Sequence, residues 1–117
     1  MNIKEFQLIC EQRSKRWLQE EEWSFLETIG AMCGESGEAA NIAKKIKRLK
    51  TKLPNKEKGL DIINYNELRM KMCMEVADSI IYGFKLLSDA DCDAEVVLRL
   101  VFDEKSIEYG FPERAPK

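Results

Sequence analysis

The chain has 117 residues, and 19 Lys and Arg residues nearly balance 21 Asp and Glu residues to leave a net charge of −2. This balance excludes a protein held on nucleic acid or on an anionic membrane by bulk charge. The chain contains no histidine, which excludes Ser-His and Cys-His catalytic pairs and imidazole metal ligands. Its length and its 44% hydrophobic residues predict a single folded domain over residues 1–117.

The four cysteines, Cys10, Cys33, Cys73 and Cys92, lie far apart in the sequence and form no C-x-x-C pair. Their spacing therefore does not indicate a zinc site. We expect free thiols that serve as small core side chains in a reducing cytoplasm. No segment has the pattern of a signal peptide, and no run of about 18 apolar residues predicts a membrane span.

The first half of the chain has the periodicity of two helices. One is expected at about residues 2–20, with Asn2 as its N-cap, and a longer one at about residues 25–49. Ser24 and Glu27 have the spacing of a capping box at the start of the second helix.

Three glycines, Gly30, Gly34 and Gly37, lie inside the predicted second helix. Each costs about 1 kcal/mol relative to alanine in a helix interior. We therefore expect another backbone to approach this helix closely, because glycine permits such an approach.

The second half of the chain has the pattern of two further helices. Residues 50–63, which contain Pro54 and Gly59, are expected to form a loop before a third helix at about residues 65–87. Asn64 and Glu67 are a plausible cap pair for the third helix.

The fourth helix is expected to start after Asp91 or Asp93 as its cap and to end near Tyr109. Gly110 has the position of a C′ residue, and Pro112 prevents continuation of the helix. Four helices with one loop of moderate length predict an all-α bundle.

Two acidic pairs are the most informative pattern in the sequence. Glu35 and Glu38 lie on the predicted second helix, and Glu75 and Asp78 on the third. A spacing of three residues places both carboxylates of a pair on one side of a helix. The pairs are surrounded by small and apolar residues, so that four converging carboxylates would need a counter-charge. Mg²⁺, which prefers oxygen ligands, would supply it, with Mn²⁺ as a substitute. Ordinary solvated surface charge is the alternative interpretation.

Two lysines continue the same helical stripes. Glu35, Glu38 and Lys45 fall on one stripe, and Lys71 falls on the stripe of the second acidic pair. An acidic metal site beside amines suits a ligand that brings its own negative charge, such as a polyphosphate.

The predicted third helix is apolar around most of its circumference. A helix of this kind is buried on more than one side, which predicts a homo-oligomer, either a dimer or a tetramer, formed through this helix. The alternative is a Met-rich groove that accepts a helix of another protein.

The acidic pairs and their neighbours resemble a known family. The segments Gly34-Glu35-Ser36-Gly37-Glu38-Ala39-Ala40-Asn41 and Glu75-Val76-Ala77-Asp78-Ser79-Ile80-Ile81-Tyr82 are similar to those of the MazG-like, all-α nucleoside triphosphate pyrophosphohydrolases. The resemblance covers residues 13–112 and includes the tail around Gly110-Phe111-Pro112.

This resemblance implies an Mg²⁺-dependent enzyme that cleaves a nucleoside triphosphate to the monophosphate and pyrophosphate and assembles as a dimer or a tetramer. Glu35, Glu38, Glu75 and Asp78 would be both metal ligands and catalytic residues. The residues expected to bind substrate are Trp17, Asn41, Lys45, Lys71, Tyr82, Arg99 and Asp103. Asp103 departs from the family pattern, which has Asn at the matching position.

Two other functions fit the same pattern. The chain could act on phosphoribosyl-ATP or an alarmone with the same fold. It could also be a catalytically silent helical scaffold that retains the acidic pairs as structure. Release of pyrophosphate distinguishes an enzyme from such a scaffold.

Overall fold

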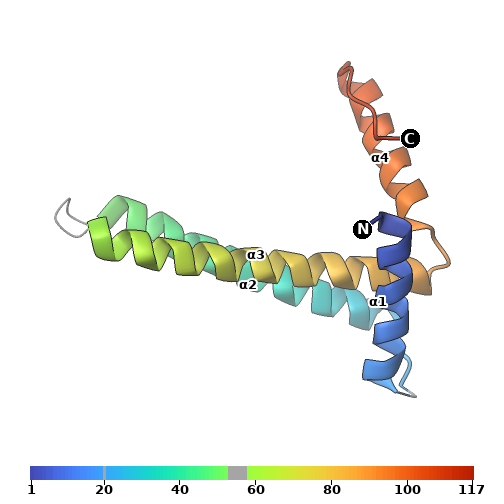
Figure 1. Cartoon of the computed structure of the whole chain (residues 1–117), viewed down its shortest axis with the longest axis horizontal. Helices are drawn as coiled ribbons and strands as arrows, with labels where there is room; N and C mark the ends of the chain where they lie inside the picture. The colour runs from blue at the N-terminus through green and yellow to red at the C-terminus, as the bar shows by residue number, and fades with distance from the viewer. Residues whose placement is uncertain (20, 53–57) are drawn as a thin grey trace. The chain divides into compact units, whose positions relative to one another are not determined.

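The computed structural model describes residues 1–19, 21–52 and 58–117, without the side chains of residues 50–52 and 58–63. In these ranges the chain is all-helical and contains no strand (Figure 1). Its helices are α1 (Ile3–Leu18), α2 (Phe25–Lys52), α3 (Lys58–Asp89) and α4 (Ala94–Tyr109). The predicted all-α class and the number of helices are therefore confirmed for the described residues, whereas their packing into one bundle stays a prediction.

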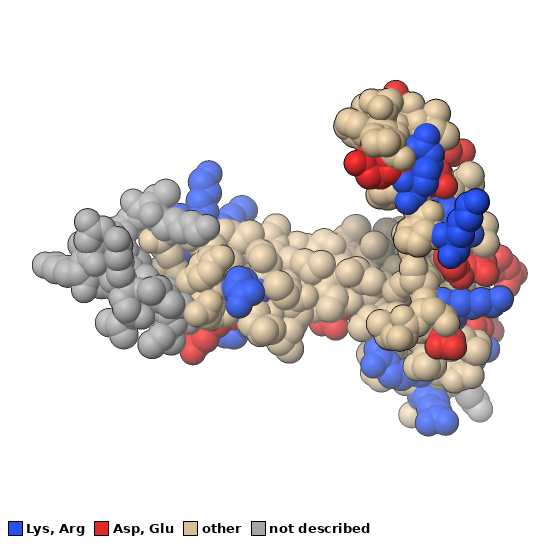
Figure 2. Space-filling model, turned by 45° about the horizontal axis from the view of Figure 1, so that its top comes forward, with Lys and Arg blue, Asp and Glu red and all other residues tan. Residues whose placement is uncertain are grey.

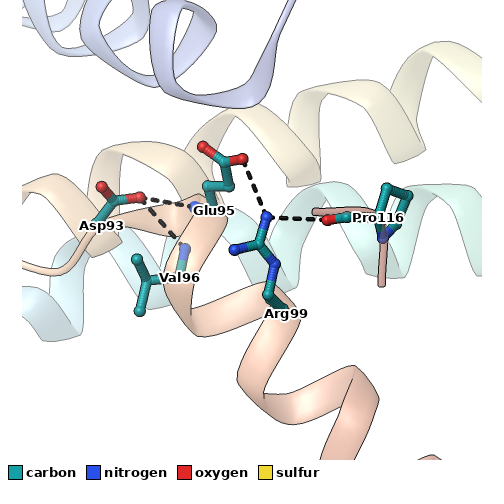
Figure 3. Close-up of polar contacts among 5 residues, drawn as sticks. All are labelled: Asp93, Glu95, Val96, Arg99 and Pro116. Atoms are coloured by element: carbon teal, nitrogen blue, oxygen red, sulfur yellow. Dashed lines mark hydrogen bonds and ion pairs between the residues drawn. The ribbon is translucent and has the colours of Figure 1, made fainter. Parts of the chain in front are cut away.

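Local hydrogen bonds explain where α1 and α4 begin and end. The Asn2 side chain accepts a hydrogen bond from the backbone N–H of Glu5 at 2.8 Å and caps α1. Of the two predicted caps for α4, Asp93 is the one used, and its carboxylate accepts from backbone N–H groups of the first turn (Figure 3). Gly110 ends α4 with a φ of 73°, a left-handed conformation that glycine adopts without a steric penalty.

The predicted loop at residues 50–63 is too long. α2 continues to Lys52 and α3 already begins at Lys58, so Asn64 lies inside α3 and does not cap it. Pro54 belongs to residues 53–57, which lie outside the described residues. Lysines and Leu60 favour a helix in the added segments. Gly59 is tolerated there at a cost of about 1 kcal/mol.

The chain consists of two compact units. The second unit, Leu26–Gly83, contains nearly all of α2 and most of α3, which run antiparallel and side by side (Figure 1). The hydroxyls of Ser36 and Ser79 lie 3.0 Å apart between the two helices, and Ser79 donates to the carbonyl of Met32 at 3.4 Å. These contacts fix the register of α2 against α3.

The first unit contains Met1–Phe25 and Phe84–Lys117, and in it α1 contacts α4. Gln7 is buried there. Its amide donates to the Ser88 hydroxyl at 3.2 Å and to the Cys92 carbonyl at 2.8 Å, and its oxygen accepts from the Ala94 N–H at 2.8 Å. Because all three bonds are made, this buried amide ties α1 to the connection between α3 and α4 without an unpaired polar group.

An apolar stripe of α3 remains exposed in the second unit. It recurs at helical spacing on a side of the helix away from Ser79 and consists of Met70, Cys73, Met74, Ala77 and Ile80. Met74 is 60% exposed and Ile80 is 52% exposed. Figure 2 shows that the visible middle of the α2–α3 pair carries few charged side chains. We call this set the α3 stripe.

The glycines of α2 lie beside an equally open surface. With Leu26, Ile29 and Cys33, they form an exposed line of apolar and small residues that we call the α2 stripe: Leu26, Ile29, Gly30, Cys33, Gly34 and Gly37. A Cβ added at any of the three glycines would meet nothing within 4 Å. The expected close backbone approach is therefore wrong for the described part of this chain alone.

The cysteines differ from the expected core thiols in two of four cases. All four are free thiols. Cys10 is buried and Cys92 is partly buried, whereas Cys33 and Cys73 are exposed. The exposed pair lies on the α2 stripe and the α3 stripe, which the described residues of the chain leave uncovered.

In the described part of the chain, none of the helices has both the length and the apolar content needed to cross a membrane.

Candidate functional site

The acidic pairs of α2 and α3 converge within the second unit. Glu35, Glu75 and Asp78 each have a carboxylate oxygen within 4.8 Å of the other two. The i, i+3 spacing on α3 places Glu75 and Asp78 on one side of that helix, and the register set by Ser36 and Ser79 brings Glu35 of α2 opposite to them. The sequence-based prediction that the pairs meet is therefore confirmed for these three residues.

Glu38 belongs to the same cluster through its electrostatics. A hydrogen bond between the Glu38 and Glu75 carboxyls raises the pKa of Glu38, and the negative charge of Glu75 raises it further. The pKa of Glu75 is raised first by a carboxyl hydrogen bond with Glu35 and also by the charges of Glu35 and Asp78. Without a cation, like charges thus favour the protonated forms of these groups.

Tyr82 lies next to the carboxylates, as its position one turn after Asp78 predicts. Burial raises the pKa of the Tyr82 hydroxyl, and the charges of Glu35 and Asp78 raise it further. The phenol is therefore neutral at pH 7 and remains a hydrogen-bond donor at the edge of the cluster.

The cluster has the chemistry of a site for a hard cation. Two carboxyl groups can form a hydrogen bond only if one of them is protonated. When all the carboxylates are ionised, the buried Oε2 of Glu75 has no hydrogen-bond partner among the described residues. An unpaired, buried carboxylate oxygen is unfavourable. A set of oxygen donors without sulfur or imidazole fits Mg²⁺ or Mn²⁺ better than a softer metal.

The raised pKa values predict how stability depends on pH in the absence of metal. Glu38 and Glu75 have pKa values above the ordinary 4.5, so their contribution to stability is complete below about pH 4.5 and is lost as the pH rises through the raised values. Glu38→Gln removes one of these charges. In EDTA, we expect the Tm of the variant minus that of the wild type to increase as the pH rises from about 4 to 7.

Thermal unfolding followed by circular dichroism measures this difference. Added Mg²⁺ should reduce it, because a bound cation stabilises the wild-type carboxylates. A difference that is the same at every pH would show that the carboxylates do not repel one another in the folded protein.

A basic cavity lies in the same unit, along the same helices. It has a volume of about 270 Å³ and is lined by Lys45, Arg48 and Lys71 together with Leu49, Asn64, Glu67 and Leu68. Lys45 lies seven residues after Glu38, or about 10 Å along the axis of α2 at the helical rise per residue. Lys45 and Lys71, which the sequence places on the stripes of the two acidic pairs, both line this cavity. Arg48 is a further cation that the sequence analysis did not identify.

The other residues expected to bind substrate have different positions. Asn41 is exposed on α2. Trp17 is 63% exposed and packs edge-on against Trp23, with ring centroids 5.6 Å apart. In the first unit, Arg99 and Asp103 hold the C-terminal segment against α4. Arg99 donates to the carbonyl of Pro116 at 2.9 Å (Figure 3), and Asp103 accepts from the N–H of Ala115 at 2.7 Å. Their roles in binding substrate stay predictions.

Sequence analysis missed an ion pair in the first unit that joins the buried Lys85 to the exposed Asp89. The Lys85 ammonium lies 2.5 Å from the Asp89 carboxylate and 5.9 Å from the centroid of the Trp23 ring. The i, i+4 spacing of Lys85 and Asp89 is the only signal in the sequence, and it is common on exposed helices. The burial of the Lys85 side chain distinguishes this pair, and it depends on packing between segments distant in the chain.

No protein-family model matches the chain, and no curated protein or solved structure shows a significant match to it. The geometry of the carboxylates and of the basic cavity is therefore the basis on which a function can be argued.

Proposed function

We propose that this protein is an Mg²⁺-dependent nucleotide pyrophosphohydrolase that converts nucleoside triphosphates to monophosphates and pyrophosphate, and that it limits unwanted nucleotides in the pool. The observation that carries the proposal is the convergence of Glu35, Glu75 and Asp78 within 4.8 Å, with a buried oxygen on Glu75 that has no hydrogen-bond partner among the described residues. The resemblance of the two acidic segments to the MazG-like family supports the same activity.

The charges along α2 and α3 suit a polyphosphate. The carboxylates lie at one position on the helix pair, and the cations Lys45, Arg48 and Lys71 line a cavity further along it. A triphosphate is extended and densely negative, so the cations can bind its outer phosphates while its inner phosphate lies at the carboxylates. A site for an uncharged substrate would not need both groups.

Glu35, Glu38, Glu75 and Asp78 would hold the metal. Bound Mg²⁺ would supply Lewis-acid stabilisation of the phosphate charge. The carboxylates orient the attacking water, and one carboxylate oxygen of the cluster accepts its proton. Tyr82 donates a hydrogen bond at the edge of the site. Positioning and electrostatics contribute most of the catalysis in phosphoryl transfer, so that a site without histidine is adequate.

The proposed enzyme is a homo-oligomer of two or four copies. The α3 stripe and the α2 stripe are both exposed, and a contiguous exposed apolar surface marks a site of association between proteins. The open glycines of the α2 stripe allow a helix of a second copy to approach closely. This contact would account for three glycines in one helix.

Hydrolysis in ¹⁸O-labelled water tests which bond is cut. The new bond forms between the water oxygen and the α-phosphorus, the bond from the α-phosphorus to the bridging oxygen breaks, and pyrophosphate leaves with that oxygen. We therefore expect the label in the nucleoside monophosphate and not in pyrophosphate, as measured by mass spectrometry with a panel of triphosphates. Release of a diphosphate with labelled orthophosphate would contradict the assignment, and no release with any nucleotide would favour a silent scaffold.

A further inference from the structure

A second cavity lies in the first unit of the chain. It has a volume of about 630 Å³, within the range of pockets that hold small organic ligands. Its wall includes the aromatic side chains Trp23 and Phe25 and the ion pair of the buried Lys85 with the exposed Asp89. All of its described lining residues belong to the first unit.

Lys85 is only 6% exposed, which is unusual for a lysine. Its ammonium group has three N–H donors. One points to the Asp89 carboxylate at 2.5 Å, and the face of Trp23, with its centroid at 5.9 Å, accepts the charge as a cation–π contact. Among the described residues no acceptor is present for a third N–H. A ligand in the cavity that carries a hydrogen-bond acceptor would accept from the third N–H of this buried ammonium.

Asp89 provides the complementary group. Its Oδ2 accepts the Lys85 hydrogen bond, and no described residue donates to its Oδ1. A donor and an acceptor therefore lie next to each other on the cavity wall. This pair matches an acceptor beside a donor on the edge of a ligand, such as the C=O and N–H of a lactam.

The charge of the cavity restricts the ligand further. Among the described lining residues, Glu11, Glu21, Glu22 and Asp89 give four negative charges, and Lys15 and Lys85 give two positive charges, for a net of −2. This lining disfavours a phosphate or another anion. An uncharged ring that stacks on Trp23 or Phe25 is compatible with it.

We propose that this cavity binds an uncharged lactam heterocycle, with its C=O accepting from Lys85 and its N–H donating to Asp89 Oδ1. Uracil and thymine have this edge. In adenosine and cytidine the acceptor is a ring nitrogen and the donor beside it is an exocyclic amino group, whose second N–H needs its own acceptor. The choice of nucleosides as ligands rests on the proposed function. The match between the Lys85–Asp89 pair and a lactam rests on the cavity alone.

Nuclear magnetic resonance of the tryptophan indoles tests the binding. The chain has two tryptophans. The indole signal that remains in Trp17→Phe identifies the signal of Trp23, on the cavity wall, in the spectrum of the wild type, which is the protein titrated. We expect uridine to shift this signal in EDTA, and adenosine, cytidine and N3-methyluridine to shift it at least about tenfold more weakly. N3-methyluridine differs from uridine by the loss of the N–H alone, so that this comparison needs no change to the protein.

A substitution in the Lys85–Asp89 ion pair gives a second test of ligand binding. Lys85→Met keeps the aliphatic stem and removes the ammonium, and it should weaken uridine binding by roughly tenfold or more, since hydrogen bonds to charged groups contribute that much. Lys15→Met is the matched control. Lys15 lines the same cavity and forms an i, i+4 pair with Glu11 at 3.3 Å, but its side chain is 76% exposed. It should leave uridine binding unchanged.

The results distinguish this proposal from the proposed function. Nucleosides have no phosphate and the titration contains no metal, so a failure of the carboxylate site does not affect it. Equal shifts with uridine and N3-methyluridine, equal shifts with uridine and adenosine, or no shift with any nucleoside would overturn the lactam site even if triphosphates are hydrolysed. If Lys85→Met loses helical structure, the uridine and N3-methyluridine comparison on the wild-type cavity decides the question.

Discussion

Asp78→Asn and Glu38→Gln are each expected to lower the turnover of nucleoside triphosphates by at least about 100-fold and to leave the helix content unchanged. Loss of even an outer-shell partner lowers metal affinity or activity roughly 10- to 100-fold, and these residues are proposed as direct ligands. Both substitutions keep the side-chain volume and remove one negative charge. Because the cluster is self-repelling without metal, the variants should be at least as stable as the wild type in EDTA.

Pyrophosphate release with and without excess EDTA measures the effect, and circular dichroism reports the helix content. Glu104→Gln is the matched control, because Glu104 is exposed on α4 and lies outside the cluster. Activity should disappear in EDTA and return with Mg²⁺ or Mn²⁺. Full activity of the wild type in EDTA, or unchanged turnover in both variants, would show that the carboxylate cluster does not hold a catalytic metal.

The parts of the fold that follow from local interactions were predictable. Helix formation depends on periodicity and caps, and Asn2, Asp93 and Gly110 occupy the positions that their chemistry favours. The carboxylates were also predictable, since i, i+3 spacing fixes a helix face. Given two such faces on neighbouring helices, convergence of Glu35 with Glu75 needs only the correct register.

The features that were missed depend on contacts between distant segments. Gly59 and a nearby proline predict a loop at residues 50–63, whereas α2 and α3 extend into this range. The contacts of Arg99 and Asp103 with a chain segment more than ten residues further on were also missed. Spacing within a helix carries no information about such a segment. The burial of Lys85 was hidden for the same reason.

The glycines of α2 show a third kind of failure. Their number correctly indicated a surface without side chains, but the predicted neighbour is not found among the described residues of the chain. A sequence pattern reports what a surface permits and does not identify the molecule that covers it. For the α2 stripe and the α3 stripe, a second copy of the chain is the proposed partner.

Ile80→Glu and Met74→Glu are expected to dissociate the proposed homo-oligomer. A charge buried without a partner at an apolar interface costs several kcal/mol, which corresponds to a dissociation constant at least about 100-fold higher. In the single chain these side chains are 52% and 60% exposed. A glutamate at either position is therefore compatible with the folded chain, and the loss of assembly would come from the interface.

Light scattering coupled to size exclusion measures the mass of each variant at micromolar concentration, with helix content checked on the same samples. Ile80→Leu is the control, since it keeps an apolar side chain of equal size at the same point of the α3 stripe and should preserve the wild-type mass. If the wild type is a well-folded monomer, or if both glutamate variants keep its mass, the α3 stripe is not an interface between copies. If Ile80→Glu alone dissociates the assembly, the interface lies around Ile80 and leaves out Met74, because six residues of helix separate the two by about 9 Å along the axis.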